Sequence, residues 1–195
     1  MKKIVINNYQ DYKKFLNKLW IYKSVFYKNI IFKVENKIND VNVDCIINAL
    51  NIKNRRKRID YIYDTCCDII NNKFKGINIC GFENGRCYVQ RRNINKCNGC
   101  CRKCLYQSNK GCTTSNLSCK LFNCTEVKSR YNVIEYKDLK LLKLYSLKNR
   151  ILIGSEYFSK REDVLKDLYS FSLVYATSRI VYRIIRNSIV LSKKH

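Results

Sequence analysis

The residues with the clearest chemical potential are cysteines, and they concentrate in the middle of the chain. The protein has 195 residues and 12 cysteines, nine of which fall between positions 80 and 124. A Cys-x2-Cys spacing lets one tight turn direct two sulfurs at the same metal ion, and both Cys97/Cys100 and Cys101/Cys104 have it. We therefore predict nine metal ligands: Cys80, Cys87, Cys97, Cys100, Cys101, Cys104, Cys112, Cys119 and Cys124.

The composition of the chain restricts which metal these ligands would bind. Its one histidine, His195, is the last residue, so we expect thiolate ligands alone. Two four-sulfur sites would use eight of the nine cysteines and leave one spare. Tetrahedral sulfur coordination suits Zn²⁺ or an iron–sulfur cluster, and spacing does not separate the two. We favour two zinc sites, with an iron–sulfur cluster as the alternative.

Three further cysteines lie outside this segment and are expected to have structural roles. Cys66 falls on the apolar face of a predicted helix, where a thiol behaves as a small core residue. Cys45 and Cys67 are expected to be core or half-exposed thiols. None of the three is counted among the predicted ligands.

Part of the cysteine segment resembles a known family. Cys97, Cys100 and Cys101 form a Cys-x2-Cys-Cys core, which is followed by Gly111-Cys112 and then by Cys119-Lys120-Leu121-Phe122. This order is similar to the YkgJ-like cysteine-cluster family, whose members are described as zinc- or iron-chelating. The resemblance covers about residues 97–124 and implies metal chelation at the matching cysteines. Two features depart from the family: Asn116-Leu117 stands where an Arg-Pro is usual, and Cys80 and Cys87 extend the cluster upstream.

Two common kinds of catalytic motif are absent from the sequence. There is no glycine-rich nucleotide-binding signature of either common type. Cysteine–histidine catalysis would need a histidine that the fold can position, and the chain has only His195. The sequence therefore does not decide whether the protein is an enzyme, although it favours a protein that is not one. We assign no catalytic residue.

The charge of the chain indicates a polyanionic partner. Lys and Arg total 39 against 15 Asp and Glu, a formal net charge of +24. Residues 80–124 are the most one-sided part, with eight basic side chains and one acidic side chain, Glu83. We expect nucleic acid or an acidic protein surface as the partner. The residues expected to contact it are Arg86, Arg91, Arg92, Lys96, Arg102, Lys103 and Lys110, with Tyr88 and Tyr106 stacking on bases.

We expect the protein to be cytoplasmic, or inside the host cell if it is encoded by a virus. No secretory signal is visible, and no stretch has the roughly 18 apolar residues that a membrane-spanning helix needs. Thiols stay reduced in the cytosol, which favours metal ligation over disulfides. The sequence does not indicate the oligomeric state.

The N-terminal part, residues 1–79, is predicted to be α/β. Short apolar runs at 3–6 and 30–34 are typical of strands, and apolar residues at helical spacing predict helices at 9–20 and 43–50. A third helix is expected after the basic run 53–58, with Gly76 as its stop. Its apolar face is expected to hold Ile59, Ile62, Tyr63, Cys66, Ile69, Ile70 and Phe74.

The remaining chain completes an α+β, mostly helical fold in three parts. Residues 80–124 have few aliphatic side chains and are expected to be irregular and ordered by metal. Residues 125–195 are predicted to be helical and to pack with 1–79. Ser159-Lys160-Arg161-Glu162 has the pattern of a capping box ahead of helices spanning 161–192.

These observations favour one function and leave two alternatives. We predict a metal-binding protein, with zinc held by cysteines alone, whose basic surface engages nucleic acid or an acidic partner. The first alternative is an iron–sulfur protein that acts as an electron carrier or as an enzyme. The second is an interaction protein whose cysteines sense metal or oxidants.

Overall fold

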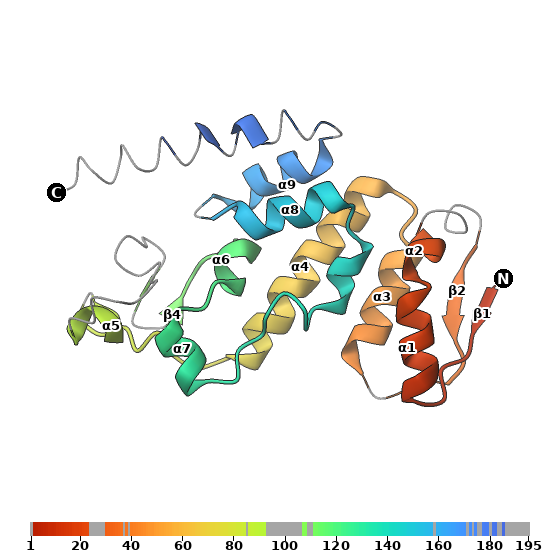
Figure 1. The fold of residues 1–195 in the computed structure, drawn as a ribbon, viewed down its shortest axis with the longest axis horizontal. Helices are drawn as coiled ribbons and strands as arrows, with labels where there is room; N and C mark the ends of the chain where they lie inside the picture. Colours follow the sequence, from red (N-terminus) through yellow and green to blue (C-terminus); the bar gives the residue numbers. More distant parts are fainter. Residues whose placement is uncertain are drawn as a thin grey trace. The chain divides into compact units, whose positions relative to one another are not determined.

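The structure is a computed structural model of the full chain. It describes residues 2–23, 30–36, 38, 40–84, 86–92, 107–108, 111–157, 159–170, 172, 174, 177–179, 181–182 and 185. Figure 1 shows the order of the elements along the chain.

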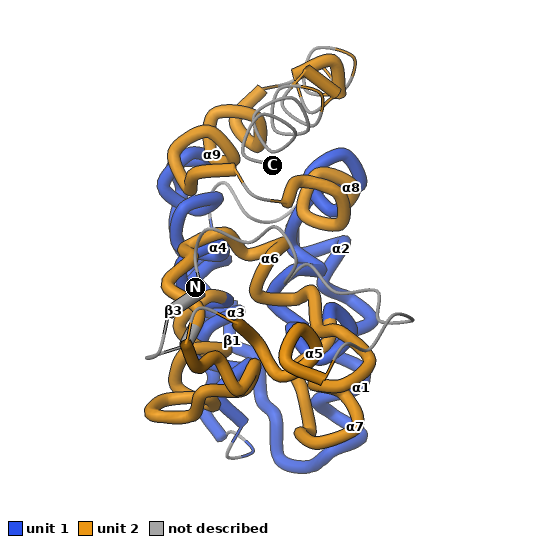
Figure 2. Tube along the Cα trace, turned by 90° about the vertical axis from the view of Figure 1, so that its left-hand side faces the viewer, with its two compact units in different colours: residues 1–66, 136–150 blue, residues 67–135, 151–195 orange. Residues whose placement is uncertain are grey.

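The chain divides into two compact units, which Figure 2 colours separately. Unit 1 consists of residues 1–66 and 136–150, and unit 2 of residues 67–135 and 151–195. Two helices, α4 (Arg55–Lys73) and α8 (Leu147–Ser155), contribute residues to both units. The division predicted from the sequence, into residues 1–79, a metal-dependent segment 80–124 and residues 125–195, stays a prediction.

Unit 1 contains a pair of short parallel strands. β1 (Lys2–Ile4) pairs with β2 (Phe32–Val34), and Lys2 lies opposite Phe32 in the register. The side chain of Asn51 accepts a hydrogen bond from the Phe32 amide (2.8 Å) and donates one to the Phe32 carbonyl (2.9 Å). One asparagine thus satisfies the backbone of a strand position that a third strand would otherwise pair.

Three helices of unit 1 cover its core. They are α1 (Tyr9–Asn17), α2 (Leu19–Ile21) and α3 (Val41–Asn51). Asn8 caps α1 by accepting from the Asp11 amide, and Asp40 caps α3 by accepting from the Asn42 amide. Each cap stabilises the first turn of its helix. The apolar face of each helix is buried. The fully or nearly fully buried side chains include Tyr12, Phe15, Leu19, Val43, Ile46 and Leu50.

The first part of α4 and a short 3-10 helix, η3 (Lys140–Leu144), complete unit 1. Ile59, Ile62 and Tyr63 of α4 are buried, as the sequence predicts. The hydroxyl of Tyr145, just after η3, donates to the Ile59 carbonyl at 2.8 Å. This buried bond joins two segments that are distant in sequence.

Unit 2 is built from short elements. They are α5 (Tyr88–Arg91), the antiparallel pair β3 (Gln107–Ser108) and β4 (Gly111–Cys112), α6 (Leu117–Leu121), α7 (Thr125–Arg130) and α9 (Arg161–Tyr169). Among the described residues beyond α9, helical positions recur between 174 and 185. There Arg179 forms an ion pair with the buried carboxylate of Asp167, at 3.3 Å.

The predicted class, α+β and mostly helical, is confirmed. The expected elements at 3–6, 9–20, 30–34 and 43–50 correspond to β1, α1 with α2, β2 and α3. The predicted capping box is wrong, because the N-cap of α9 is Lys160 and makes no side-chain capping bond. Ser159 instead lies buried one residue before the cap.

In the described part of the chain, no helix has the length and apolar character required to cross a membrane.

Candidate metal centre

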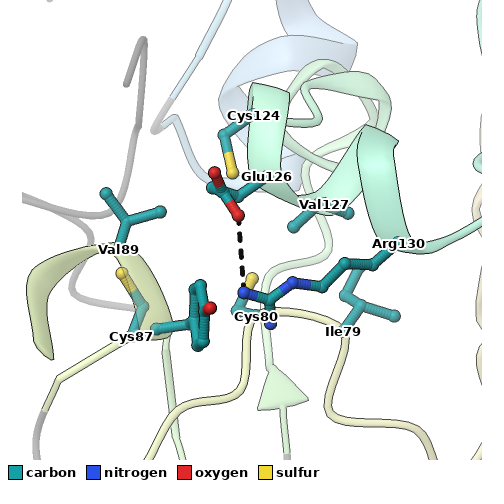
Figure 3. A pocket seen from close by; sticks show the side chains of 9 residues that line it. Ile79, Cys80, Cys87, Val89, Cys124, Glu126, Val127 and Arg130 are labelled. Atoms are coloured by element: carbon teal, nitrogen blue, oxygen red, sulfur yellow. Dashed lines mark hydrogen bonds and ion pairs between the residues drawn. The ribbon is translucent and has the colours of Figure 1, made fainter. Parts of the chain in front are cut away.

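The structure describes five of the nine predicted ligands. Cys80, Cys87 and Cys124 line one small pocket of unit 2 (Figure 3). Cys112 and Cys119 are also in unit 2 but do not line this pocket. The others, which lie outside the described residues, are Cys97, Cys100, Cys101 and Cys104.

Cys80 is positioned by a tight loop that one asparagine organises. The Asn78 side chain accepts from the Phe82 amide and donates to the Phe82 carbonyl, both at 3.0 Å. Gly81 lies between them with φ +54°, and a Cβ there would come within 3.5 Å of the Tyr88 Cβ. Glycine is favoured here by the left-handed backbone, since the distance to Tyr88 would be an ordinary van der Waals contact. The loop therefore turns Cys80 toward the chain that follows it.

Cys87 is held beside the Cys80 loop by backbone hydrogen bonds. The Tyr88 amide donates to the Cys80 carbonyl at 3.0 Å, and Glu83 and Arg86 bond reciprocally through their backbones. Cys87 is the N-cap of α5, and its amide donates to the Gln90 side chain at 2.8 Å. These bonds tie Cys87 to the Cys80 loop, and both thiols line one pocket.

Cys124 reaches the pocket from a different element. It is the N-cap residue of α7, in an extended conformation, and it is 5% exposed. Cys87 is 1% exposed, and Val89 and Val127 pack with the two cysteines in one buried cluster. The pocket wall is therefore a mixture of thiols and aliphatic groups, an environment from which water is largely excluded.

Charged groups lie at the edge of the pocket. Glu126 and Arg130, one turn apart on α7, form an ion pair at 3.4 Å, drawn as the dashed line in Figure 3. Arg91 forms a second ion pair with Glu83. Glu126 and Arg130, which both line the pocket, thus pair with each other, whereas Glu83 and Arg91 pair outside its lining.

Tyr88 lines the pocket, and its ring contacts two arginines. The guanidinium carbon of Arg130 is 3.2 Å from the centroid of its ring, and that of Arg92 is 4.5 Å away. Guanidinium groups stack well on aromatic rings, so both arginines are oriented by this contact. Stacking of Tyr88 on a base stays a prediction, and in this structure arginines contact the ring.

The donor set around the pocket suits zinc, but the thiols are not gathered around a single point. Thiolates, with one carboxylate from Glu126, are ligands that Zn²⁺ accepts. Among the described residues, no three cysteine, histidine or carboxylate side chains form a group that could hold an ion. The pocket therefore brings three predicted ligands together without assembling a finished coordination sphere.

Asn116 anchors the last part, residues 111–124, of the segment that resembles the cysteine-cluster family. This residue is fully buried, caps α6 by accepting from the Cys119 amide at 2.8 Å, and donates to the carbonyls of Glu156 and Ser159, both at 3.0 Å. Leu117 is also fully buried. Asn116 and Leu117, which depart from the family pattern, thus anchor the turn that presents Cys119, while Cys112 is exposed.

The residues expected to contact a polyanion are described only in part. Arg86, Arg91 and Arg92 are exposed, and Tyr88 is half-buried. The rest, outside the described residues, are Lys96, Arg102, Lys103, Lys110 and Tyr106. The described arginines stand on or beside α5, the helix that Cys87 begins.

The three other cysteines differ from the pocket thiols. Cys66 is fully buried on α4, which confirms its predicted place in the core. Cys67 is buried and its thiol lies 3.8 Å from the Ser115 carbonyl. Burial is the main cause that raises the pKa of the half-buried Cys45 thiol.

Sequence reasoning did not identify Glu126 and Arg130 as parts of this site. They lie just beyond the last cysteine, and their i, i+4 spacing on a helix is a common surface pattern. The available signal was their position directly after Cys124.

Comparison of the chain with protein families, with curated proteins and with solved structures finds no match.

Proposed function

We propose that the protein binds zinc through its cysteine-rich segment and uses the basic surface of the folded segment to engage nucleic acid or an acidic protein. One observation supports the zinc-binding part of this proposal: Cys80, Cys87 and Cys124 line the same pocket. These residues come from two separate stretches of sequence. Few aliphatic side chains pack around these cysteines, so the fold of the segment needs a further source of stability.

A bound ion would supply that order. The described core of the segment consists of Cys87, Val89, Cys124 and Val127, with a few half-buried neighbours. Ligation of a thiolate set by Zn²⁺ contributes folding free energy directly, because the site does not exist in the unfolded chain. Cys80, Cys87 and Cys124 would belong to one ion, and the Cys-x2-Cys pairs would supply further ligands.

The polyanion half of the proposal rests on charge. The net charge of +24 and the exposed Arg86 and Arg91 beside α5 favour an anionic partner. Thiolate ligands would reduce this charge only slightly, because each divalent ion offsets half of its four thiolates. The nucleic-acid contact residues named from the sequence are part of this proposal.

Elemental analysis tests the zinc-binding part of the proposal. The zinc-to-protein ratio is measured for wild type and two variants, all purified without oxygen. Wild type is expected to carry zinc, Cys124→Ser to lose at least one equivalent, and Cys45→Ser to match wild type. Cys45 is the matched control, since it is a half-buried thiol outside the pocket.

Other outcomes would select the alternatives. Brown protein that contains iron and acid-labile sulfide would replace zinc by an iron–sulfur cluster. Protein without metal that forms disulfides reversibly would favour the sensing role. Equal zinc content in Cys124→Ser and wild type would remove the pocket from the metal site.

A further inference from the structure

One face of the C-terminal segment of unit 2 is apolar and exposed. Among the described residues, the segment after α9 has helical positions from 174 to 185 (Figure 1). We define the C-terminal apolar face as four large side chains of this segment: Val174 is 78% exposed, Val181 55%, Tyr182 65% and Ile185 54%. At helical spacing their positions fall within about 100° of the circumference, over about three turns. They therefore form a stripe rather than scattered single side chains.

An ion pair fixes which side of this segment faces the rest of unit 2. Arg179 Nε lies 3.3 Å from Oδ1 of Asp167, a residue of α9 whose side chain is completely buried. Thr177 and Arg179 are half-buried. By the same helical spacing, both residues lie outside the arc of the apolar face. The contact with α9 thus uses another side of the segment, and the apolar face is left on the surface of unit 2.

The charge of the chain around this face has one sign. Residues 168–195 contain no acidic side chain, and their basic side chains are Arg179, Arg183, Arg186, Lys193 and Lys194. The three arginines recur at positions i, i+4 and i+7, the spacing of successive helical turns. A partner that covers the face therefore meets apolar side chains in a basic stretch of chain, and an anionic partner is favoured.

The possible partners differ in what they offer to such a stripe. A nucleic acid offers phosphates but no continuous apolar surface. A second copy of this chain brings the same basic stretch and a net charge of +24, so two copies repel each other. A protein partner would need an acidic groove that matches one convex stripe. An anionic bilayer offers charged headgroups with hydrocarbon directly beneath them, and fluid hydrocarbon adapts to a convex helix without a matching groove.

We propose that the C-terminal apolar face binds the surface of an anionic lipid bilayer, with the helix lying in the plane of the interface. Val174, Val181 and Ile185 enter the apolar layer. Tyr182 lies at the level of the headgroups, where a ring with a polar end is well placed. The basic residues of the stretch are attracted to the anionic headgroups. The inference goes beyond the proposed function, because none of the four side chains belongs to residues 80–124.

The first test is cosedimentation of the full-length protein with vesicles of phosphatidylcholine, with and without phosphatidylserine. Wild type is expected to bind the vesicles that contain phosphatidylserine and to keep part of this binding at high salt, where charge is screened. The double variant Val181→Ser/Ile185→Ser is expected to bind about tenfold more weakly, for the loss of about half the transfer free energy of two aliphatic side chains. The control Ile31→Ser/Val41→Ser makes the same exchange in unit 1, at positions 57% and 66% exposed, and should bind like wild type.

A second test reads the position of the face directly. Trp20 is the single tryptophan of the chain and is 66% exposed in unit 1. In the variant Trp20→Phe/Tyr182→Trp, indole fluorescence reports from the C-terminal apolar face alone. Phosphatidylserine vesicles with brominated acyl chains should quench this fluorescence strongly, and should quench the indole at position 20 of wild type much less. Equal quenching at the two positions would remove the face from the bilayer contact.

The substitutions are placed at exposed side chains so that folding is preserved. Thermal unfolding followed by circular dichroism should give the same midpoint for Val181→Ser/Ile185→Ser as for wild type. If the double variant unfolds earlier, Val174→Ser takes its place, at the most exposed of the four positions. This single variant is expected to bind vesicles about threefold more weakly.

Three outcomes would overturn the inference. Wild type that binds neither kind of vesicle has no bilayer contact at all. If the double variant binds as tightly as its control, charge alone holds the protein to the lipid and the apolar face is not involved. If wild type is a dimer in sedimentation velocity and the double variant is a monomer, the face is a contact between copies of the chain. None of these outcomes alters the zinc measurement, which concerns residues 80–124.

Discussion

The interior of unit 1 and the cysteine pocket of unit 2 are ordered by different means. In unit 1, long aliphatic and aromatic side chains such as Phe15, Phe32, Ile46 and Ile62 are almost completely buried. In the pocket segment, the buried cluster consists of two cysteines and two valines, and loop shape depends on hydrogen bonds from Asn78. The first kind of core is stable through the area removed from water, whereas the second buries little area.

The contrast indicates where an added ion would matter. A segment that already buries large apolar side chains gains little from a ligand, because its order has been achieved by packing. A segment with few such side chains must offset its conformational entropy in another way, and metal ligation is one of the strongest. We therefore expect the two regions to respond oppositely to metal removal and to core substitution.

The largest expected effect follows metal removal. Chelation should open the pocket segment and leave unit 1 folded, since apparent binding free energies of structural zinc in small domains are about 10–16 kcal/mol. Amide hydrogen exchange should then speed up at Tyr88 and Arg86, whose amides bond within the Cys80 loop, and stay slow in α3. Addition of Zn²⁺, but not Mg²⁺, should restore protection. If protection were lost equally in both regions, the pocket segment would depend on metal no more than unit 1 does.

A core substitution should have the converse effect. Ile46→Ala, at a fully buried position of α3, is expected to lower the free energy of unfolding by about 2–5 kcal/mol and to leave zinc content unchanged. Urea denaturation and elemental analysis measure the two quantities. Val41→Ala, at an exposed position of the same helix, is the control and should change stability by less than about 0.5 kcal/mol. Loss of zinc in Ile46→Ala would show that the pocket depends on the core of unit 1.

The smallest expected effect concerns pH and Lys23. The folded state holds the pKa of Lys23 near 8, below its ordinary value of 10.5, so between these values the unfolded chain binds more protons. The free energy of unfolding should therefore rise with pH across that range in wild type, and rise less in Lys23→Met. Urea denaturation at neutral pH and near the upper end of the range checks this. The control Lys13→Met, at an exposed position of α1, should show the same pH dependence as wild type. If Lys23→Met also showed that pH dependence, the lowered pKa of Lys23 in the folded state would be contradicted.

The helices of unit 1 could be predicted because their pattern is local. Apolar residues at helical spacing, such as Tyr12, Phe15 and Leu19, identify the buried faces of α1 and α2 without knowledge of their partners. The capping box before α9 was predicted wrongly. Its four residues match the pattern, but Ser159 is buried and Lys160 takes the cap position. Tertiary burial overrides a local pattern when the two compete for the same side chain.

The sequence by itself determined the class of fold and the buried faces of the main helices, and the metal ligands that it predicts stay a prediction. Only the tertiary structure decided that Cys80, Cys87 and Cys124 share a pocket and that Glu126 and Arg130 line it with them. The reason is physical. Periodicity and ligand chemistry are properties of neighbouring residues, whereas the meeting of distant segments depends on the balance of packing and hydrogen bonding across the whole chain.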